Sequence, residues 1–159
     1  MHILVALGRN FCKPPPASQQ TLGVALTWAI AATIVRPAEM ALSISGDDGF
    51  SLTGMELETA VRFQYHLVHM IWIDGVYNMV AVQEEQEYGS PSGTTFGPID
   101  PVRYAESFGV HGFKIQSPDQ IQGVLKQAFF TPGRVLIEVH VDYRDNHRLF
   151  ELVNERSIH

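Results

Sequence analysis

The chain has 159 residues, of which 45% are hydrophobic and 18% are charged, so it holds enough apolar material for one folded domain and does not have the composition of a disordered chain. Its 11 basic and 17 acidic residues give a net charge of −6, which argues against binding to nucleic acid or to an anionic membrane. The single cysteine, Cys12, and the lack of a secretion signal lead us to expect a cytoplasmic protein.

The N-terminal part of the chain divides into an arm and a helix. A short apolar run is followed by three consecutive prolines at residues 14–16, which fix an extended backbone without donors. We expect residues 1–18 to form an irregular arm or a truncated leading element, and residues 19–159 to form the domain. The apolar stretch 22–35 is too short to cross a bilayer and is expected to be a buried helix.

The middle of the chain reads as a strand, a helix and a strand. Residues 41–45 and 67–73 are short apolar runs of the kind found in strands that are buried on both faces. Between these runs, Thr53 and Glu56 stand at the spacing of a capping box and predict a helix that begins there and ends near residue 63.

The second half of the chain repeats this alternation. Residues 113–116 predict a strand, and Ser117, Pro118 and Gln120 have the spacing of a helix start with a capping box. Residues 135–141 are the clearest strand of the chain. Alternating strands and helices predict an α/β fold with three layers, in which a mainly parallel sheet carries helices on both faces.

An acidic turn follows the strand at residues 41–45, and it reads Gly46-Asp47-Asp48-Gly49-Phe50. Glycines allow backbone N–H groups to approach an anion closely, which suits a phosphate group. Carboxylates suit such a site only when a divalent cation lies between them and the phosphate, as Mg²⁺ does. The turn therefore predicts a site for a metal and a phosphate.

A second carboxylate, Asp74, follows the next strand of the predicted sheet. Because neighbouring parallel strands end at the same edge, Asp47 and Asp74 are expected to lie close enough to share one cation. Either Asp-Gly pair alone is more typical of an ordinary turn. Spacing and composition do not name the cofactor.

Several segments together resemble one family. They are residues 19–50, which read QQTLGVALTWAIAATIVRPAEMALSISGDDGF, and the shorter segments MELETAVR, WIDGVYNMVAVQEEQEY, YAESFG and VDYRDN. Together they resemble the C-terminal diphosphate-binding domain of acetolactate synthases, particularly the catabolic type. The resemblance covers nearly everything from Gln19 to about Phe150. It implies the thiamine diphosphate-binding fold, with thiamine diphosphate and Mg²⁺ as cofactors.

The resemblance also implies a role for particular residues. It makes the side chains of Asp47 and Asp74 and the backbone carbonyl of Val76 the ligands of Mg²⁺. It assigns the backbone N–H groups of Gly46, Asp48 and Gly49 to the diphosphate. The main chain of Gln20 and Leu22 would contact the aminopyrimidine, and the Leu22 side chain would be the wedge that bends the cofactor. Val80 would bind the cofactor, and Met79 and Gln83 would line the catalytic pocket.

The activity implied by the resemblance is condensation of two pyruvates to 2-acetolactate with loss of CO2. In this family the glutamate that protonates the aminopyrimidine belongs to a separate pyrimidine domain, and 159 residues leave no room for one. We therefore expect a homo-oligomer that needs the pyrimidine domain of another chain, and an isolated chain that is inactive. The apolar surfaces around residues 22–28 and 79–82 should be partly exposed and favour association.

Two departures from the family pattern favour a different function. Asp48 stands where the family has Gly or Ala, and its charge either repels the diphosphate, points to solvent or helps to hold the metal. Val76 replaces a glycine whose backbone conformation can be unfavourable for a β-branched residue. These departures favour the alternative of a non-catalytic orphan or interaction module that keeps the fold and has lost the cofactor.

Two other features were interpreted as structural. His66 and His69 lie on opposite faces of a predicted strand, which disfavours a shared metal. Residues 89–97 are rich in Gly, Ser, Thr and Pro and predict a mobile loop.

Overall fold

The computed structural model describes residues 3–7 and 21–143 of the chain. Five strands form one sheet in which every neighbouring pair is parallel, in the order β1-β2-β3-β5-β4. The strands are β1 (Ile3–Leu7), β2 (Met40–Gly46), β3 (Leu67–Ile73), β4 (His111–Ile115) and β5 (Arg134–His140). None of the helices in the described ranges has the length and apolar character that crossing a membrane requires.

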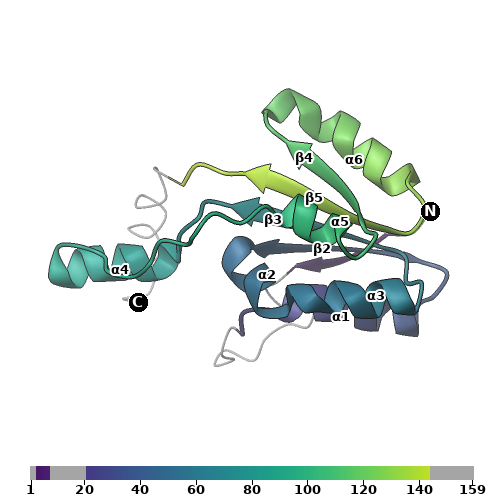
Figure 1. The fold of residues 1–159 in the computed structure, drawn as a ribbon, viewed down its shortest axis with the longest axis horizontal. Coiled ribbons are helices and arrows are strands. Elements are labelled where there is room, and N and C mark those ends of the chain that lie inside the picture. Colours follow the sequence, from purple (N-terminus) through teal and green to yellow (C-terminus); the bar gives the residue numbers. More distant parts are fainter. Residues whose placement is uncertain (1–2, 8–20, 144–159) are drawn as a thin grey trace, which may run out of the picture.

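Helices lie on both faces of the sheet, as Figure 1 shows. They are α1 (Val24–Val35), α2 (Asp47–Thr53), α3 (Leu57–Arg62), α4 (Asn78–Tyr88), α5 (Pro101–Glu106) and α6 (Ile121–Phe130), with two short 3-10 helices, η1 (Gly54–Glu56) and η2 (Pro118–Gln120). Side chains of α1, α2, α3 and α5 pack on one face, and side chains of α6 pack on the other. The predicted three-layer α/β fold is therefore confirmed.

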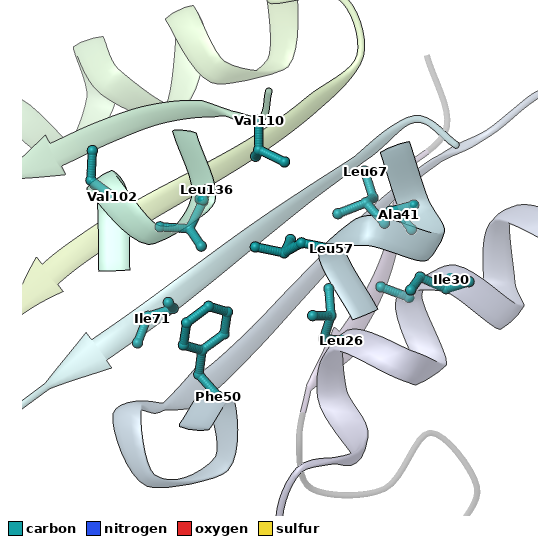
Figure 2. Close-up of a cluster of buried hydrophobic side chains, with 13 residues drawn as sticks. Leu26, Ile30, Ala41, Phe50, Leu57, Leu67, Ile71, Val102, Val110 and Leu136 are labelled. Atoms are coloured by element: carbon teal, nitrogen blue, oxygen red, sulfur yellow. The ribbon is translucent and has the colours of Figure 1, made fainter. Parts of the chain in front are cut away.

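The larger core cluster joins the first face of the sheet to its helices (Figure 2). Its members include Leu26 and Ile30 of α1, Phe50 of α2, Leu57 of α3 and Ile71 of β3. On β3, alternate side chains enter the two clusters, since Leu67 and Ile71 belong to the first, and Val68 and Met70 to the second. Burial on both faces explains why β3 is a nearly continuous apolar run.

His69 is the polar residue in that run, and it is fully buried. Its Nδ1 lies 2.7 Å from the Ser43 hydroxyl and its Nε2 lies 3.2 Å from the Ser45 hydroxyl, both on β2, while its ring stacks on Phe50 at 5.7 Å. Burial lowers the pKa of His69 to about 3 because the charged ring would lose its hydration. His69 is therefore a neutral core residue, and both ring nitrogens face serines.

The four strands that were predicted, which are β2 to β5, begin and end within two residues of their predicted bounds, and residues 67–73 match β3 in full. A helical segment does follow Thr53, which is the N-cap of η1, and it ends with α3 at Arg62, close to the predicted end. The predicted capping box is wrong, because the Thr53 side chain makes no cap hydrogen bond. The chain becomes helical at Asp47, directly after β2, and Thr53 ends α2 while its hydroxyl donates to the Gly23 carbonyl at 2.6 Å. A contact to a distant segment has replaced the local cap, and sequence spacing alone does not reveal such a contact.

Residues 3–7 fell in the expected arm, and in the structure they form β1, which pairs in parallel with β2 over five residues. The apolar run before the prolines is therefore an edge strand of the sheet. Residues 8–18, with the three prolines and Cys12, lie outside the described residues. The domain boundary at residues 18 and 19 stays a prediction.

Candidate functional site

The two predicted metal ligands lie at the carboxyl edge of the sheet, next to each other. Asp47 is the first residue of α2, directly after β2, and Asp74 directly follows β3, the neighbouring strand. The Oδ2 atom of Asp47 accepts a hydrogen bond of 2.8 Å from the N–H of Gly75. One bond thus joins the two segments that carry the carboxylates, as their position after neighbouring parallel strands predicts.

The electrostatic environment of Asp47 disfavours its charge. Burial raises the pKa of Asp47 above its ordinary value, and repulsion from the carboxylates of Asp74 and Asp48 raises it further. The N–H groups of Gly75 and Asp48 lower the pKa of Asp47 and offset part of this rise. Three carboxylates close to a partly buried site form a local excess of negative charge that a cation would neutralise.

Asp74 has one satisfied and one unsatisfied oxygen. Its Oδ1 accepts a hydrogen bond of 3.3 Å from the N–H of Val76. Its Oδ2 is buried and has no hydrogen-bond partner within residues 3–7 and 21–143. A buried carboxylate oxygen without a partner is costly, because it has lost water and gained nothing in return. A hard cation would satisfy it, so the donor set of Asp47, Asp74 and a nearby carbonyl fits Mg²⁺.

Val76, whose carbonyl is predicted to be a metal ligand, does not have the strained backbone that the sequence suggested. It forms an antiparallel bridge with Thr95, and its φ is not positive, since Gln64 is the one non-glycine residue of the described ranges with a positive φ. The left-handed position belongs to Gly75, at φ 74°. The Val76 carbonyl accepts the N–H of Asn78 at 2.7 Å, which leaves its second lone pair for a metal. The expected strain at Val76 is therefore absent.

Asp48 turns its side chain back toward the glycine turn. Its Oδ1 accepts a hydrogen bond of 2.6 Å from the N–H of Gly49, while its own N–H donates to Asp47 Oδ1 at 3.0 Å. A Cβ added to Gly46 would clash with the same Asp48 oxygen. Two of the three N–H groups predicted for a diphosphate thus already have carboxylate partners.

The segment before α1 lies against this turn. Leu22 is 55% exposed and stands next to Gly23, whose φ is 81°. A Cβ on Gly49 would come within 3.4 Å of the Gly23 nitrogen, so the segment and the start of α2 are close neighbours. Leu22 is thus available as a wedge, although that role stays a prediction. Gln20 lies outside the described residues.

The predicted pocket residues on α4 are not brought onto the site. Met79 and Val80 are 47% and 44% exposed, Gln83 is exposed, and no residue of α4 is buried against the described part of the chain. Figure 1 shows α4 extending beyond the carboxyl edge of the sheet. The catalytic and cofactor-binding roles of these three residues stay predictions.

A loop that the sequence analysis did not assign to the site lies beside Asp47. A pocket of about 160 Å³ opens there, and it is lined by Asp47, Phe50, Ser51, Ile73, Gly75, Phe96, Gly97, Pro98, Ile99 and Pro101. Residues 89–97 are a loop as predicted, but Thr94 is buried and Thr95 bridges to Val76. The Gly97-Pro98 pair is the local sequence signal for a segment without regular secondary structure here.

Larger metal clusters are not found in residues 3–7 and 21–143. No group of three or more His, Cys, Asp or Glu side chains there is arranged to hold a metal. The predicted ligand set of two carboxylates and one backbone carbonyl is smaller than such a group, and it stays a prediction; Mg²⁺ uses a set of this kind when phosphate oxygens and water complete its shell.

Comparison with known proteins identifies relatives over most of the chain. Residues 4–139 match the family model described as thiamine pyrophosphate enzyme, C-terminal TPP binding domain. An acetolactate synthase of Bacillus subtilis (strain 168) is 53% identical over 127 residues, which are 80% of this chain and 22% of the relative.

A catabolic acetolactate synthase of Raoultella terrigena is 48% identical over 128 residues, covering 80% of this chain and 23% of that protein. A more distant relative, a 2-hydroxyacyl-CoA lyase of Oryza sativa subsp. japonica, is 30% identical over 128 residues, covering 77% of this chain and 22% of the lyase. The chain thus spans less than a quarter of the length of these curated relatives.

Proposed function

The chain belongs to the thiamine pyrophosphate enzymes and matches their C-terminal TPP-binding domain, and from this premise we propose that it is the diphosphate- and Mg²⁺-binding part of an acetolactate synthase. Thiamine pyrophosphate and thiamine diphosphate are the same cofactor. The proposed reaction joins two pyruvates to give 2-acetolactate and CO2. The two most similar of the relatives named above are acetolactate synthases, which supports this choice.

The observation that carries the proposal is the unsatisfied Oδ2 of Asp74 beside Asp47. Both carboxylates stand on segments that follow central strands, and the sheet pairs these strands in register. Asp47 and Asp74 would hold the cation, with the Val76 carbonyl as a third ligand. The cation would neutralise the repulsion that raises the pKa of Asp47 and would attract a diphosphate.

The bound cofactor would supply the ring that accepts electrons when pyruvate loses CO2. The chain's own residues would orient it. Leu22 would press against the cofactor from the segment before α1, where more than half of its side chain is exposed. Met79, Val80 and Gln83 would line the pocket from α4, which needs a second surface to pack against because none of its side chains is buried within the described part of this chain.

The proposal includes a partner. The curated relatives are more than four times as long as the matched segment, so the complete activity requires parts that this domain does not carry. We propose that a pyrimidine domain of another chain completes the site and that pyruvate is the substrate. Exposed Leu22, Trp28, Met79 and Val80 are apolar surface for such contacts and for homo-oligomers. A cytoplasmic location remains part of this proposal.

A non-catalytic module is the second candidate function, and one observation favours it. The carboxylate of Asp48 occupies the N–H of Gly49, which a diphosphate would need. A chain that had lost its cofactor would be free to replace an anion with its own side chain. The fold would then persist as an interaction domain.

Calorimetric titration of the purified chain with thiamine diphosphate and Mg²⁺ separates the two functions. The enzyme module should release heat on binding and melt at a higher temperature when both ligands are present. Absence of heat and of any thermal shift at millimolar ligand would leave the non-catalytic module. Pyruvate should yield 2-acetolactate only after a pyrimidine domain is added, and turnover by the isolated chain would contradict the proposed division of labour.

Light scattering tests self-association. The apparent mass should rise with protein concentration because the exposed apolar side chains gain by burial in an interface. A constant monomer mass over a wide concentration range would contradict the proposed homo-oligomer.

A further inference from the structure

We propose that the Asp48 carboxylate is an internal competitor of the cofactor diphosphate, and that the cofactor affinity of this chain is limited by displacement of this side chain. The inference rests on the proposed function, because it concerns the same glycine turn. It goes further by assigning to Asp48 the regulation of that site, where the sequence alone left three possible orientations open.

The first observation is what the carboxylate touches. Asp48 Oδ1 lies 2.6 Å from the Gly49 nitrogen, and a Cβ on Gly46 would clash with the same oxygen. One oxygen thus lies between the two glycines of the turn. The resemblance to the family assigns the N–H groups of both glycines to the diphosphate, so Asp48 lies where a phosphate oxygen would approach.

The second observation is that the Asp48 carboxylate accepts its hydrogen bond from the turn, and not from Asp47 or Asp74, the two predicted metal ligands. Asp47 shares its carboxylate between the N–H groups of Asp48 and Gly75, and Asp74 has the unsatisfied oxygen. The bond from the Gly49 N–H holds Asp48 Oδ1 in the turn. The Asp48 carboxylate thus takes the hydrogen-bond donor that a diphosphate would use. It opposes diphosphate binding in two ways, because it occupies that donor and because its negative charge repels the phosphate oxygens.

Binding of a diphosphate therefore requires the Asp48 side chain to rotate away from Gly49 and to remain close to a new negative charge. Rotation breaks one hydrogen bond, which the incoming phosphate oxygen can replace. The repulsion between the Asp48 carboxylate and the diphosphate is not compensated in this way, and only the bound metal ion would reduce it. Removal of the carboxylate should accordingly strengthen binding, which is the opposite of what a metal ligand would show.

The experiment compares the wild-type chain with Asp48→Ala and Asp48→Asn, using inorganic pyrophosphate and, separately, thiamine diphosphate, each with saturating Mg²⁺. Asn keeps the oxygen that accepts from Gly49 and loses the charge, so it separates repulsion from occupancy. Glu106→Gln is the control, because this exposed residue is the last of α5, outside the glycine turn, and its change removes the same charge.

Asp48→Ala should bind both ligands roughly tenfold to a hundredfold more tightly than the wild type, with Asp48→Asn in between and Glu106→Gln unchanged. Equal affinity of the wild type and both Asp48 variants, or weaker binding by Asp48→Ala, overturns the inference and leaves the proposed function standing. Failure of all four proteins to bind either ligand overturns the proposed function itself.

A readout without ligand checks the contact directly. In the amide NMR spectrum of the free protein, the Gly49 proton should lie downfield and move upfield in Asp48→Ala, because the carboxylate bond is lost. Glu106→Gln should leave this resonance in place. A Gly49 resonance that is the same in the wild type and in Asp48→Ala contradicts the proposed contact even if affinities change.

Discussion

Asp47 and Gly75 are joined across two neighbouring strand ends by a hydrogen bond of 2.8 Å between the Asp47 carboxylate and the Gly75 N–H. The bond fixes the orientation of one proposed metal ligand from the segment that carries the other, Asp74. The Oδ2 atom of Asp74 has no hydrogen-bond partner among the described residues. The backbone of the proposed site is therefore already in place, while a buried carboxylate oxygen and the repulsion among the aspartates are not compensated.

Asp47→Asn should separate the structural role of Asp47, which is the hydrogen bond to Gly75, from its proposed role as a metal ligand. The amide oxygen of Asn can still accept from the Gly75 N–H, so the melting temperature should change little. The lost charge should weaken Mg²⁺-dependent binding of thiamine diphosphate by roughly tenfold or more. Calorimetry at fixed Mg²⁺ measures the affinity. Undiminished affinity would exclude Asp47 as a ligand.

Gly75→Ala should lower stability by about 1 kcal/mol, because φ of 74° is unfavourable for a residue with a side chain. The space around its Cβ is open, so the cost is conformational and not steric. Gly123→Ala is the matched control. It lies within α6, also in open space, and should raise stability by about 0.5–1 kcal/mol. Urea denaturation measures both changes, and a destabilised Gly123→Ala or a stabilised Gly75→Ala would contradict the assignment.

His69 should make the fold sensitive to acid. The pKa of His69 is about 3 in the folded state and near 6.5 in the unfolded chain, so the unfolded state binds one more proton between these values. Stability is fully present above pH 6.5 and falls by about 1.4 kcal/mol for each pH unit below it. The expected loss from pH 7 to pH 5 is about 2 kcal/mol.

Urea denaturation at pH 7, 6 and 5 measures this slope. The variant His69→Gln should flatten it, although its stability at pH 7 should be lower because the core is less well filled. The exposed neighbour provides the control, since His66→Gln should leave the slope as it is. An unchanged slope in His69→Gln would mean that other groups cause the acid sensitivity.

A buried carboxylate on β5 needs its lysine. Glu138 is 3% exposed, and the Nζ atom of Lys114 on β4 lies 3.0 Å from its Oε2 in an ion pair. The carboxylate of Glu138 is the first cause of a raised pKa of Lys114. Lys114→Met should cost about 1–3 kcal/mol, because a buried charge loses its partner while His140 still contacts Oε1.

The double variant Lys114→Met with Glu138→Gln should recover part of this loss, since the buried charge is then gone. The control is the exposed pair of Arg103 and Asp100, where Arg103→Met should cost less than about 0.5 kcal/mol. Thermal or urea denaturation measures all three. A loss for Lys114→Met as small as that for Arg103→Met would mean that solvent already compensates Glu138.

Sequence reasoning succeeded where burial leaves a continuous pattern. Residues 67–73 match β3 because both faces of a central parallel strand are apolar, and the two acidic turns are adjacent because they follow neighbouring strands. The prediction failed where a contact to a distant segment determines the local structure, as at Thr53, and where an element is very short. Thr53 ends a helix and donates to Gly23, and α5 is six residues long with an N-cap at Asp100, which is too short for a periodic signal.

The orientation of Asp48 could not be predicted for a similar reason. Its side chain has several local partners, and its sequence position permits a bond to the turn, exposure to solvent or contact with a metal. The choice depends on backbone geometry at Gly46 and Gly49 that the sequence does not encode in any spacing.

Helix α4 has a consequence for how the domain responds to its environment. An eleven-residue helix without buried side chains in the described part of the chain receives little support from tertiary contacts, and such helices are marginal in water. Its amide hydrogens should exchange with deuterium far sooner than those of β3 next to it. Slow exchange in α4 would then indicate that another protein surface has packed against this helix. Hydrogen exchange in the segment of Met79 and Gln83 would therefore report assembly directly.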